Sequence, residues 1–180
     1  MNANLIKTLS QQAQSQISAD LSLQDSSSVV TEFERLLNAA LEVVYLTPSP
    51  KNDEIAQRVG QSLIKKVSQV PPQTRLEFIQ NELIEQEVRN LNMTAWKIAQ
   101  QWIAKSPNRP ALQAQAKTVY ENTQQLYNLL DQMGTSWRDR YNRSLAEALS
   151  DCRYVLGLSQ HSSLRLGRLL KILTRTIRNY

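Results

Sequence analysis

The spacing of apolar residues is the feature that most limits which fold this chain can adopt. Apolar side chains recur every three or four residues, for example along Val29–Leu46 at Val29, Val30, Phe33, Leu36, Leu37, Ala40, Leu41 and Val44. This period places them on one face of an α-helix. No segment alternates apolar and polar residues over a useful length, so the sequence predicts helices and no β-strands.

The positions of helix breakers and helix caps divide the chain into successive helices. Only 4 Gly and 6 Pro occur, which disfavours a fold built on tight turns. The segment 20–28 supplies a capping serine, Asn52 or Asp53 caps the next helix, and Pro71 and Pro72 end it. Gly134 is expected just past a helix end, and Ser136 is expected to cap the helix after it. The predicted helices span residues 2–19, 29–46, 53–70, 74–105, 111–133, 137–158 and 162–180, with a bend allowed near residues 90–94. We predict an all-α helical bundle of six to seven helices, mostly antiparallel, with short loops.

The expected domain organisation has a minor and a major part. Residues 1–24 form a polar, glutamine-rich N-terminal helix whose thin apolar line attaches it loosely. Residues 25–180 form a single bundle, and its basic C-terminal helices occupy 134–180. A single cysteine excludes an internal disulfide, and the chain shows neither a secretory leader nor an apolar run of membrane-spanning length. These features predict a cytoplasmic protein without a membrane span.

The chain is poor in the residues from which catalytic and metal centres are built. His161 is the only histidine and lies beside two serines in a predicted turn, where a solvent-exposed loop residue is the ordinary interpretation. Cys152 lies on an apolar helix face and is expected in the core. Glu82 and Glu85 share a helix face and have the spacing to bind a hard cation, although such carboxylates are usually solvated. No glycine-rich phosphate loop is present. We therefore predict no enzymatic activity, no catalytic residue, no bound metal and no cofactor.

Positive charge is concentrated at the end of the sequence. Up to Asp131 the chain has 12 Lys and Arg against 13 Asp and Glu, a net charge of −1. From Gln132 onward it has 9 against 3, a net charge of +6, and eight of those nine cations are arginines. Such asymmetry indicates an anionic partner, either nucleic acid or a membrane surface.

The closing segment, Ser162–Tyr180, separates its charged and apolar residues on opposite sides of a helix. Its cations follow one another every three or four residues with no acidic residue between them, and they form a ridge about 20 Å long. Arginine binds phosphate in bidentate geometry, so the ridge suits sequence-independent contact with the backbone of single-stranded DNA or RNA. The ridge and three arginines of the preceding helix are the predicted nucleic-acid-binding residues: Arg165, Arg168, Lys171, Arg175, Arg178, Arg138, Arg140 and Arg143. Lys105 and Arg109 are weaker candidates.

Three other interpretations remain open at this point, two of the basic helix and one of the whole chain. The helix can dock its leucine face in the bundle and leave the arginines as a solvated surface. It can lie on an anionic membrane, although that mode favours Trp or Phe on the apolar face and only Tyr180 is aromatic. The whole chain can also be a helical protein-interaction adaptor or assembly factor, whose apolar helices or glutamine-rich N-terminal segment dock a partner protein.

In its size, helical content and late basic segments "SWRDRYNRSLAEALSDCRYVLGL" and "LRLGRLLKILTRTIRNY", the chain resembles the small subunits of CRISPR RNA-guided effector (Cascade-like) complexes. The resemblance covers the whole chain and includes no diagnostic motif. It implies a non-enzymatic subunit of an antiviral ribonucleoprotein complex, present in several copies beside other subunits. It also implies that Arg and Lys side chains hold the backbone of the guide or target strand.

Overall fold

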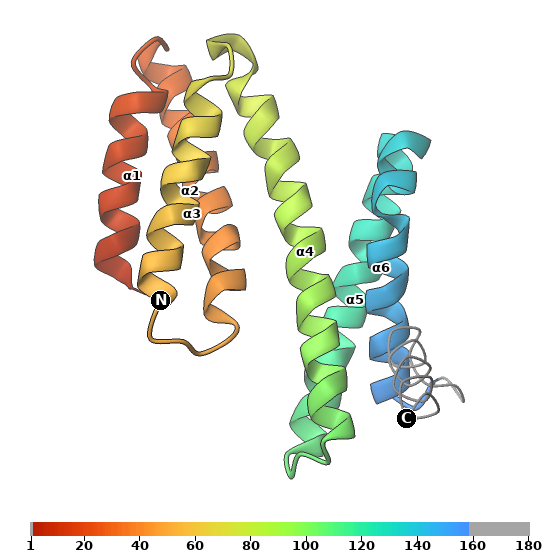
Figure 1. Ribbon diagram of the computed structural model, residues 1–180. Coiled ribbons are helices and arrows are strands. Elements are labelled where there is room, and N and C mark those ends of the chain that lie inside the picture. The colour runs from red at the N-terminus through yellow and green to blue at the C-terminus, as the bar shows by residue number, and fades with distance from the viewer. Residues whose placement is uncertain (1, 159–180) are drawn as a thin grey trace, which may run out of the picture. The chain divides into compact units, whose positions relative to one another are not determined.

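The computed structural model describes residues 2–158, in which six α-helices and one short 3-10 helix account for nearly all of the secondary structure. The helices are α1 (Ala3–Ile17), α2 (Leu23–Tyr45), α3 (Asn52–Ser68), η1 (Pro72–Thr74), α4 (Arg75–Ile103), α5 (Arg109–Met133) and α6 (Thr135–Val155) (Figure 1). No strand occurs within residues 2–158, and the predicted all-α class is confirmed. The helix predicted over 162–180 and the turn that contains His161 lie outside the described residues.

The chain divides into two compact units, Met1–Asn90 and Leu91–Tyr180. The boundary falls inside α4, so this helix supplies its first half to one unit and its second half to the other. The sequence predicted a single bundle over 25–180 instead. A continuous helix carries no loop signal at such a boundary, which is why the sequence did not mark it.

The N-terminal helix α1 is packed into the first unit beside α2 and α3 (Figure 1). Leu9, Ala13 and Ile17, which form its thin apolar line, are at most 1% exposed. A Cβ added to Gly60 of α3 would lie 2.5 Å from Leu9 Cδ1, so the absence of a side chain at Gly60 allows α1 and α3 to approach closely. Phe33 and the leucines of α2 complete this core.

Arg75 connects three parts of the first unit from a buried position, where the residue is only 3% exposed. Its guanidinium donates hydrogen bonds to the carbonyl oxygens of Ile17 at 2.5 Å, Val70 at 3.0 Å and Ser68 at 3.4 Å. Asp20 lies 3.6 Å away as its ionic partner. Arg75 therefore binds carbonyls that the ends of α1 and α3 leave without intrahelical partners.

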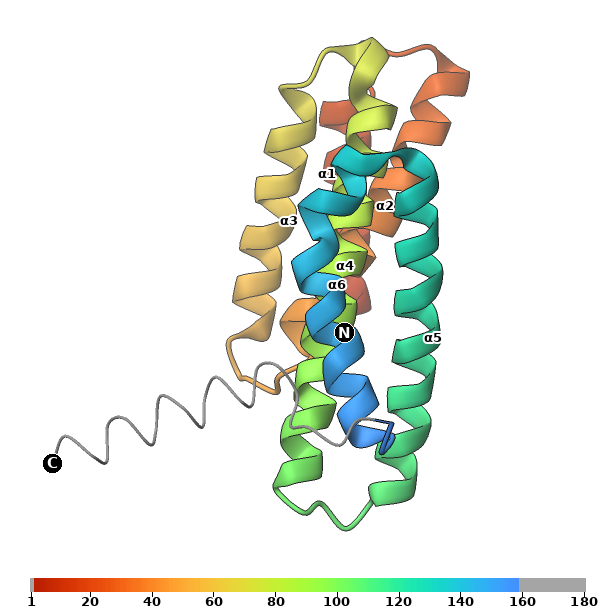
Figure 2. The same cartoon turned by 90° about the vertical axis from the view of Figure 1, so that its right-hand side faces the viewer.

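In the second unit, α5 and α6 lie side by side along most of their length (Figures 1 and 2). The second half of α4 joins them through the side-chain amide of Asn92, which donates to the carbonyl of Ser144 at 2.6 Å. Ala95 and Ala99 of α4 are fully buried. Cys152 is 1% exposed, as predicted for a small core residue.

Several helix ends differ from the sequence prediction. Helix α2 begins at Leu23, six residues before the predicted start, because Ser22 caps it and accepts a hydrogen bond from the backbone of Asp25. Asn52 is the first residue of α3, and its side chain donates to the carbonyl of Thr47 and does not cap the helix. Ser136 also lies inside its helix, because α6 begins at Thr135 directly after Gly134. Residues 90–94 continue α4 without a break in the helix.

Candidate nucleic-acid interface

The predicted interface falls into two parts, of which the structure describes one. The ridge residues Arg165, Arg168, Lys171, Arg175 and Arg178 lie outside the described residues. Arg138, Arg140 and Arg143 lie on the first half of α6. Residues 91–158 contain eight Lys and Arg against five Asp and Glu, whereas residues 1–90 contain eight against eleven. The described part of the second unit is therefore basic, and the first unit is acidic.

Arg138 connects the end of α5 to the start of α6. Its guanidinium donates a hydrogen bond to Asp131 at 2.9 Å and lies 3.6 Å from Asp139. The hydrogen bond to Asp131, and then the charges of Asp131 and Asp139, raise the pKa of Arg138 above its ordinary value. Two carboxylates thus balance this cation, and a phosphate that binds here must compete with them.

Arg140 and Arg143 are three residues apart on α6, so they lie within about 60° of each other around the helix axis. The Arg143 side chain is 80% exposed, and its guanidinium lies 3.5 Å from Glu147. The guanidinium of Arg140 lies over the ring of Tyr141, 5.5 Å from the ring centroid. Arg143 is therefore the solvent-facing member of this i,i+4 ion pair, and its guanidinium is accessible to an anion from solvent.

The weaker candidates Lys105 and Arg109 lie at the connection between α4 and α5. Lys105 has a φ of 55°, which few residues other than glycine adopt. Arg109 is the first residue of α5, and its guanidinium lies 4.6 Å from the ring centroid of Trp102. This distance is within the range of a cation–π interaction, which fixes the arginine against the end of α4.

The structure adds one arginine that the sequence prediction left out. Arg153 of α6 lies over the ring of Tyr120 of α5, 5.7 Å from its centroid, and donates a 3.5 Å hydrogen bond to the Tyr120 hydroxyl. The two residues are 33 positions apart. Their proximity depends on how α5 pairs with α6, and the helical period of either segment alone does not contain this information.

The two glutamates considered as cation ligands take part in separate ion pairs. Glu82 accepts a 3.0 Å hydrogen bond from Lys66 of α3, and Glu85 lies 3.6 Å from Arg89 one turn along α4. Residues 2–158 contain no group of three or more His, Cys, Asp or Glu side chains arranged to hold a metal ion. Each of the two carboxylates therefore has a basic partner of its own.

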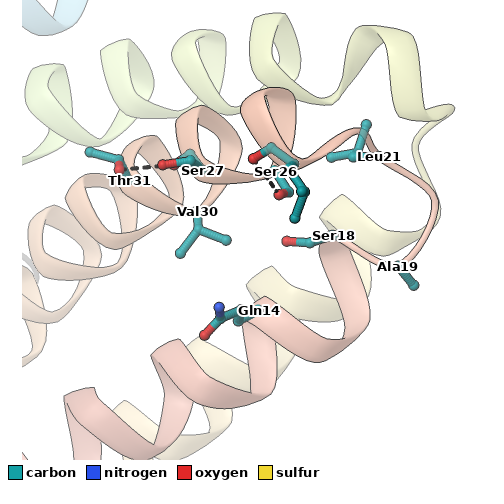
Figure 3. Close-up of a pocket in the computed structure, with 9 residues that line it drawn as sticks. Gln14, Ser18, Ala19, Leu21, Ser26, Ser27, Val30 and Thr31 are labelled. Carbon is teal, nitrogen blue, oxygen red and sulfur yellow. Dashed lines mark hydrogen bonds between the residues drawn. The ribbon is translucent and has the colours of Figure 1, made fainter.

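A cavity lies in the first unit, between the end of α1 and the start of α2 (Figure 3). It has a volume of about 530 Å³ and is lined by Gln14, Ser18, Ala19, Leu21, Leu23, Ser26, Ser27, Val30 and Thr31. Ser26 and Thr31 already donate to the backbone carbonyls of Leu23 and Ser27. None of the lining side chains is charged, so this cavity offers no counter-charge for a phosphate.

No protein-family model, curated protein or solved structure matches this chain. Among residues 2–158 there is also no helix with the length and apolar character needed to cross a membrane.

Proposed function

We propose that this protein is a non-enzymatic helical subunit of a nucleoprotein assembly that binds a nucleic-acid backbone through its basic C-terminal part. The observation that carries the proposal is the net charge of +6 after Gln132, beside −1 for everything before it. The resemblance to CRISPR small subunits indicates the kind of assembly, an RNA-guided complex in the cytoplasm with other protein subunits. The principal contacts in this proposal are Arg165, Arg168, Lys171, Arg175 and Arg178.

The arginines of α6 play a secondary role in the proposal. The Arg143 side chain is 80% exposed and pairs with Glu147, whose side chain is 16% exposed, so a phosphate reaches the guanidinium directly from solvent and competes with one carboxylate. Arg138 is held by two carboxylates and exchanges them for phosphate less readily. We therefore rank Arg143 above Arg138 as a phosphate contact.

Charge reversal in the closing segment tests the proposal. Arg168→Glu combined with Arg175→Glu is expected to lower the affinity for single-stranded DNA and RNA roughly tenfold or more at low salt, because each arginine replaces a counterion on the nucleic acid. The affinity of the unaltered protein should fall steeply as salt is added. Fluorescence anisotropy of labelled oligonucleotides across a salt series measures both effects.

A matched control separates local contact from overall charge. Lys7→Glu combined with Lys51→Glu makes the same change in net charge, at two exposed lysines of the first unit, and is expected to have a much smaller effect. Equal losses from the two double variants would show that only net charge matters. No binding by the unaltered protein at micromolar concentration and low salt would refute the proposal.

Purification of the native complex from a cell lysate, followed by nuclease treatment, distinguishes the alternative functions. A native complex that survives nuclease treatment and contains protein partners without nucleic acid would indicate an adaptor or assembly factor. Flotation with liposomes that contain anionic lipid, in the absence of nucleic-acid binding, would indicate a peripheral membrane protein.

A further inference from the structure

A narrow strip of aromatic and amide side chains runs along the surface between α5 and α6. Three of its members come from α5 and three from α6, and each is in contact with another member or with a shared small cavity. We call it the α5–α6 strip and define it by Tyr120, Gln124, Tyr127, Asn142, Leu149 and Arg153.

The α5–α6 strip is continuous from one end to the other. Arg153 touches Tyr120, whose hydroxyl also accepts a 3.2 Å hydrogen bond from Gln124. Gln124 and Tyr127 then line a cavity of about 240 Å³ together with Asn128 and Leu149. The hydroxyl of Tyr127 donates to the side-chain oxygen of Asn142 at 3.3 Å.

The uncharged members of the α5–α6 strip lie between two cations. Arg153 closes one end, and Arg138 lies beyond the other end, where it is paired with Asp131. These two arginines are fifteen residues apart on α6, or about 22 Å along a helix axis. The spacing suits a short stretch of a nucleic-acid strand whose bases face the uncharged middle of the α5–α6 strip.

The chemistry of the α5–α6 strip fits nucleobases better than phosphate alone. Tyr120, Tyr127 and Leu149 are half-buried, so each presents part of an apolar surface on which a flat base can lie. The exposed amides of Gln124 and Asn142 carry both donors and acceptors, which is the pattern that reads the edge of an unpaired base. A duplex keeps its bases stacked and unavailable for this kind of contact.

We infer that the α5–α6 strip binds unpaired nucleobases, so that the protein prefers single-stranded nucleic acid that carries bases over a bare phosphate chain. Arg153 and Arg138 bind phosphates at the two ends of the bound stretch. This inference rests on the proposed function, because the ridge of the closing segment supplies most of the electrostatic affinity. It adds a contact that depends on the bases themselves.

An abasic oligonucleotide separates the two contributions, since it has the same phosphates and lacks the bases. The full-length protein is expected to bind a short oligothymidylate about tenfold more tightly than an abasic strand of the same length, as stacking of a single base accounts for such a factor. Anisotropy at fixed low salt measures the ratio. Equal affinity for the two strands would overturn the inference and leave the proposed function intact, whereas failure of both strands to bind would overturn both.

Replacement of the rings locates the contact. Tyr120→Leu combined with Tyr127→Leu keeps apolar volume and removes the flat surfaces, so the ratio should fall toward one because the affinity for oligothymidylate drops toward that for the abasic strand. Tyr154→Leu is the matched control, because Tyr154 is a half-buried tyrosine of α6 outside the α5–α6 strip. A ratio that survives in the double variant, or falls equally in the control, would contradict the assignment.

A cross-link to the unaltered protein gives an answer that does not depend on how the variants fold. Bromouracil in the oligonucleotide should react on irradiation with residues of 117–131 or 138–153, identified by mass spectrometry. Cross-links confined to other parts of the chain would overturn the inference.

Discussion

Arg75 holds a full positive charge almost out of contact with water. In this position it is surrounded by three backbone carbonyls and one carboxylate, which compensate for its lost hydration. The carbonyls belong to the ends of α1 and α3 and to the turn before η1, so a single side chain fixes the corner where these segments meet.

Replacement of Arg75 by methionine is expected to lower the free energy of unfolding of the first unit by about 2–4 kcal/mol, because buried carbonyls lose their donors. Urea unfolding followed by far-ultraviolet circular dichroism measures the loss. Arg58→Met is the control, since the Arg58 side chain is 75% exposed and pairs only with Glu54. Its expected effect is within about 0.5 kcal/mol. Equal midpoints for the two variants would contradict the role assigned to Arg75.

Asp53 and Tyr45 form a second residue-scale feature, a hydrogen-bonded pair on the surface of the first unit. Asp53 accepts hydrogen bonds from the Tyr45 hydroxyl and from the side chain of Asn2, and these two contacts lower the pKa of the Asp53 carboxyl. The bond to Asp53 is also the main reason why the pKa of Tyr45 is raised. The folded state therefore favours charged Asp53 and neutral Tyr45.

The sign of the pH dependence follows from the direction of each shift. The Asp53 contribution to stability is present above the ordinary aspartate pKa of about 3.9 and is lost as the pH falls through the lower folded value. In a carbon-detected NMR titration, the Asp53 midpoint should lie below this ordinary value and should move upward in Tyr45→Phe. An unchanged midpoint in Tyr45→Phe would show that the Tyr45 hydrogen bond does not cause the shift.

At the scale of elements, Gly134 alone connects α5 to α6. Its φ of 119° and ψ of 163° fall in a region that residues with a Cβ scarcely adopt. A Cβ added to Gly134 meets no atom within 4 Å. The cost of Gly134→Ala therefore comes from the backbone conformation and not from steric contact with neighbouring atoms.

Gly134→Ala is expected to destabilise the second unit by about 1–3 kcal/mol. Trp96, Trp102 and Trp137, the only tryptophans, all belong to this unit, so tryptophan fluorescence during urea unfolding reports its stability directly. Gly157→Ala is the comparison, because Gly157 has a φ of 70° and the left-handed helical region costs a non-glycine residue less. A larger loss at Gly157 than at Gly134 would contradict this account of the connection.

The elements themselves were largely predictable from the sequence, because each helix buries a face with the helical period. The start of α2 was missed because serines 26–28 are indifferent helix formers. The helix begins where Ser22 and Asp25 form hydrogen bonds with each other, a local contact that produces no periodic pattern in the sequence. The pairing of Arg153 with Tyr120 and the α5–α6 strip were missed for a different reason. They depend on which faces of α5 and α6 meet, which is a tertiary property.

At the scale of the whole molecule, charge and fold divide the chain in similar ways. The first unit, residues 1–90, has a net charge of −3, and residues 91–180 have a net charge of +8 from thirteen cations and five acidic residues. The charge asymmetry is evident from the sequence by counting, but the count placed the change at residue 131 and not at the boundary between the units. The asymmetry is the reason for testing nucleic-acid binding with charge reversals matched across the two units.

The position of α4 determines how the protein can be divided for study. A cut at residue 90 would sever a helix of 29 residues near its middle and would create two new helix ends, each with unpaired backbone groups. Fragments that overlap and both contain Arg75–Ile103 avoid this damage, one comprising residues 1–103 and the other 75–180. Expression of the two units as separate proteins thus requires that the shared helix be encoded twice.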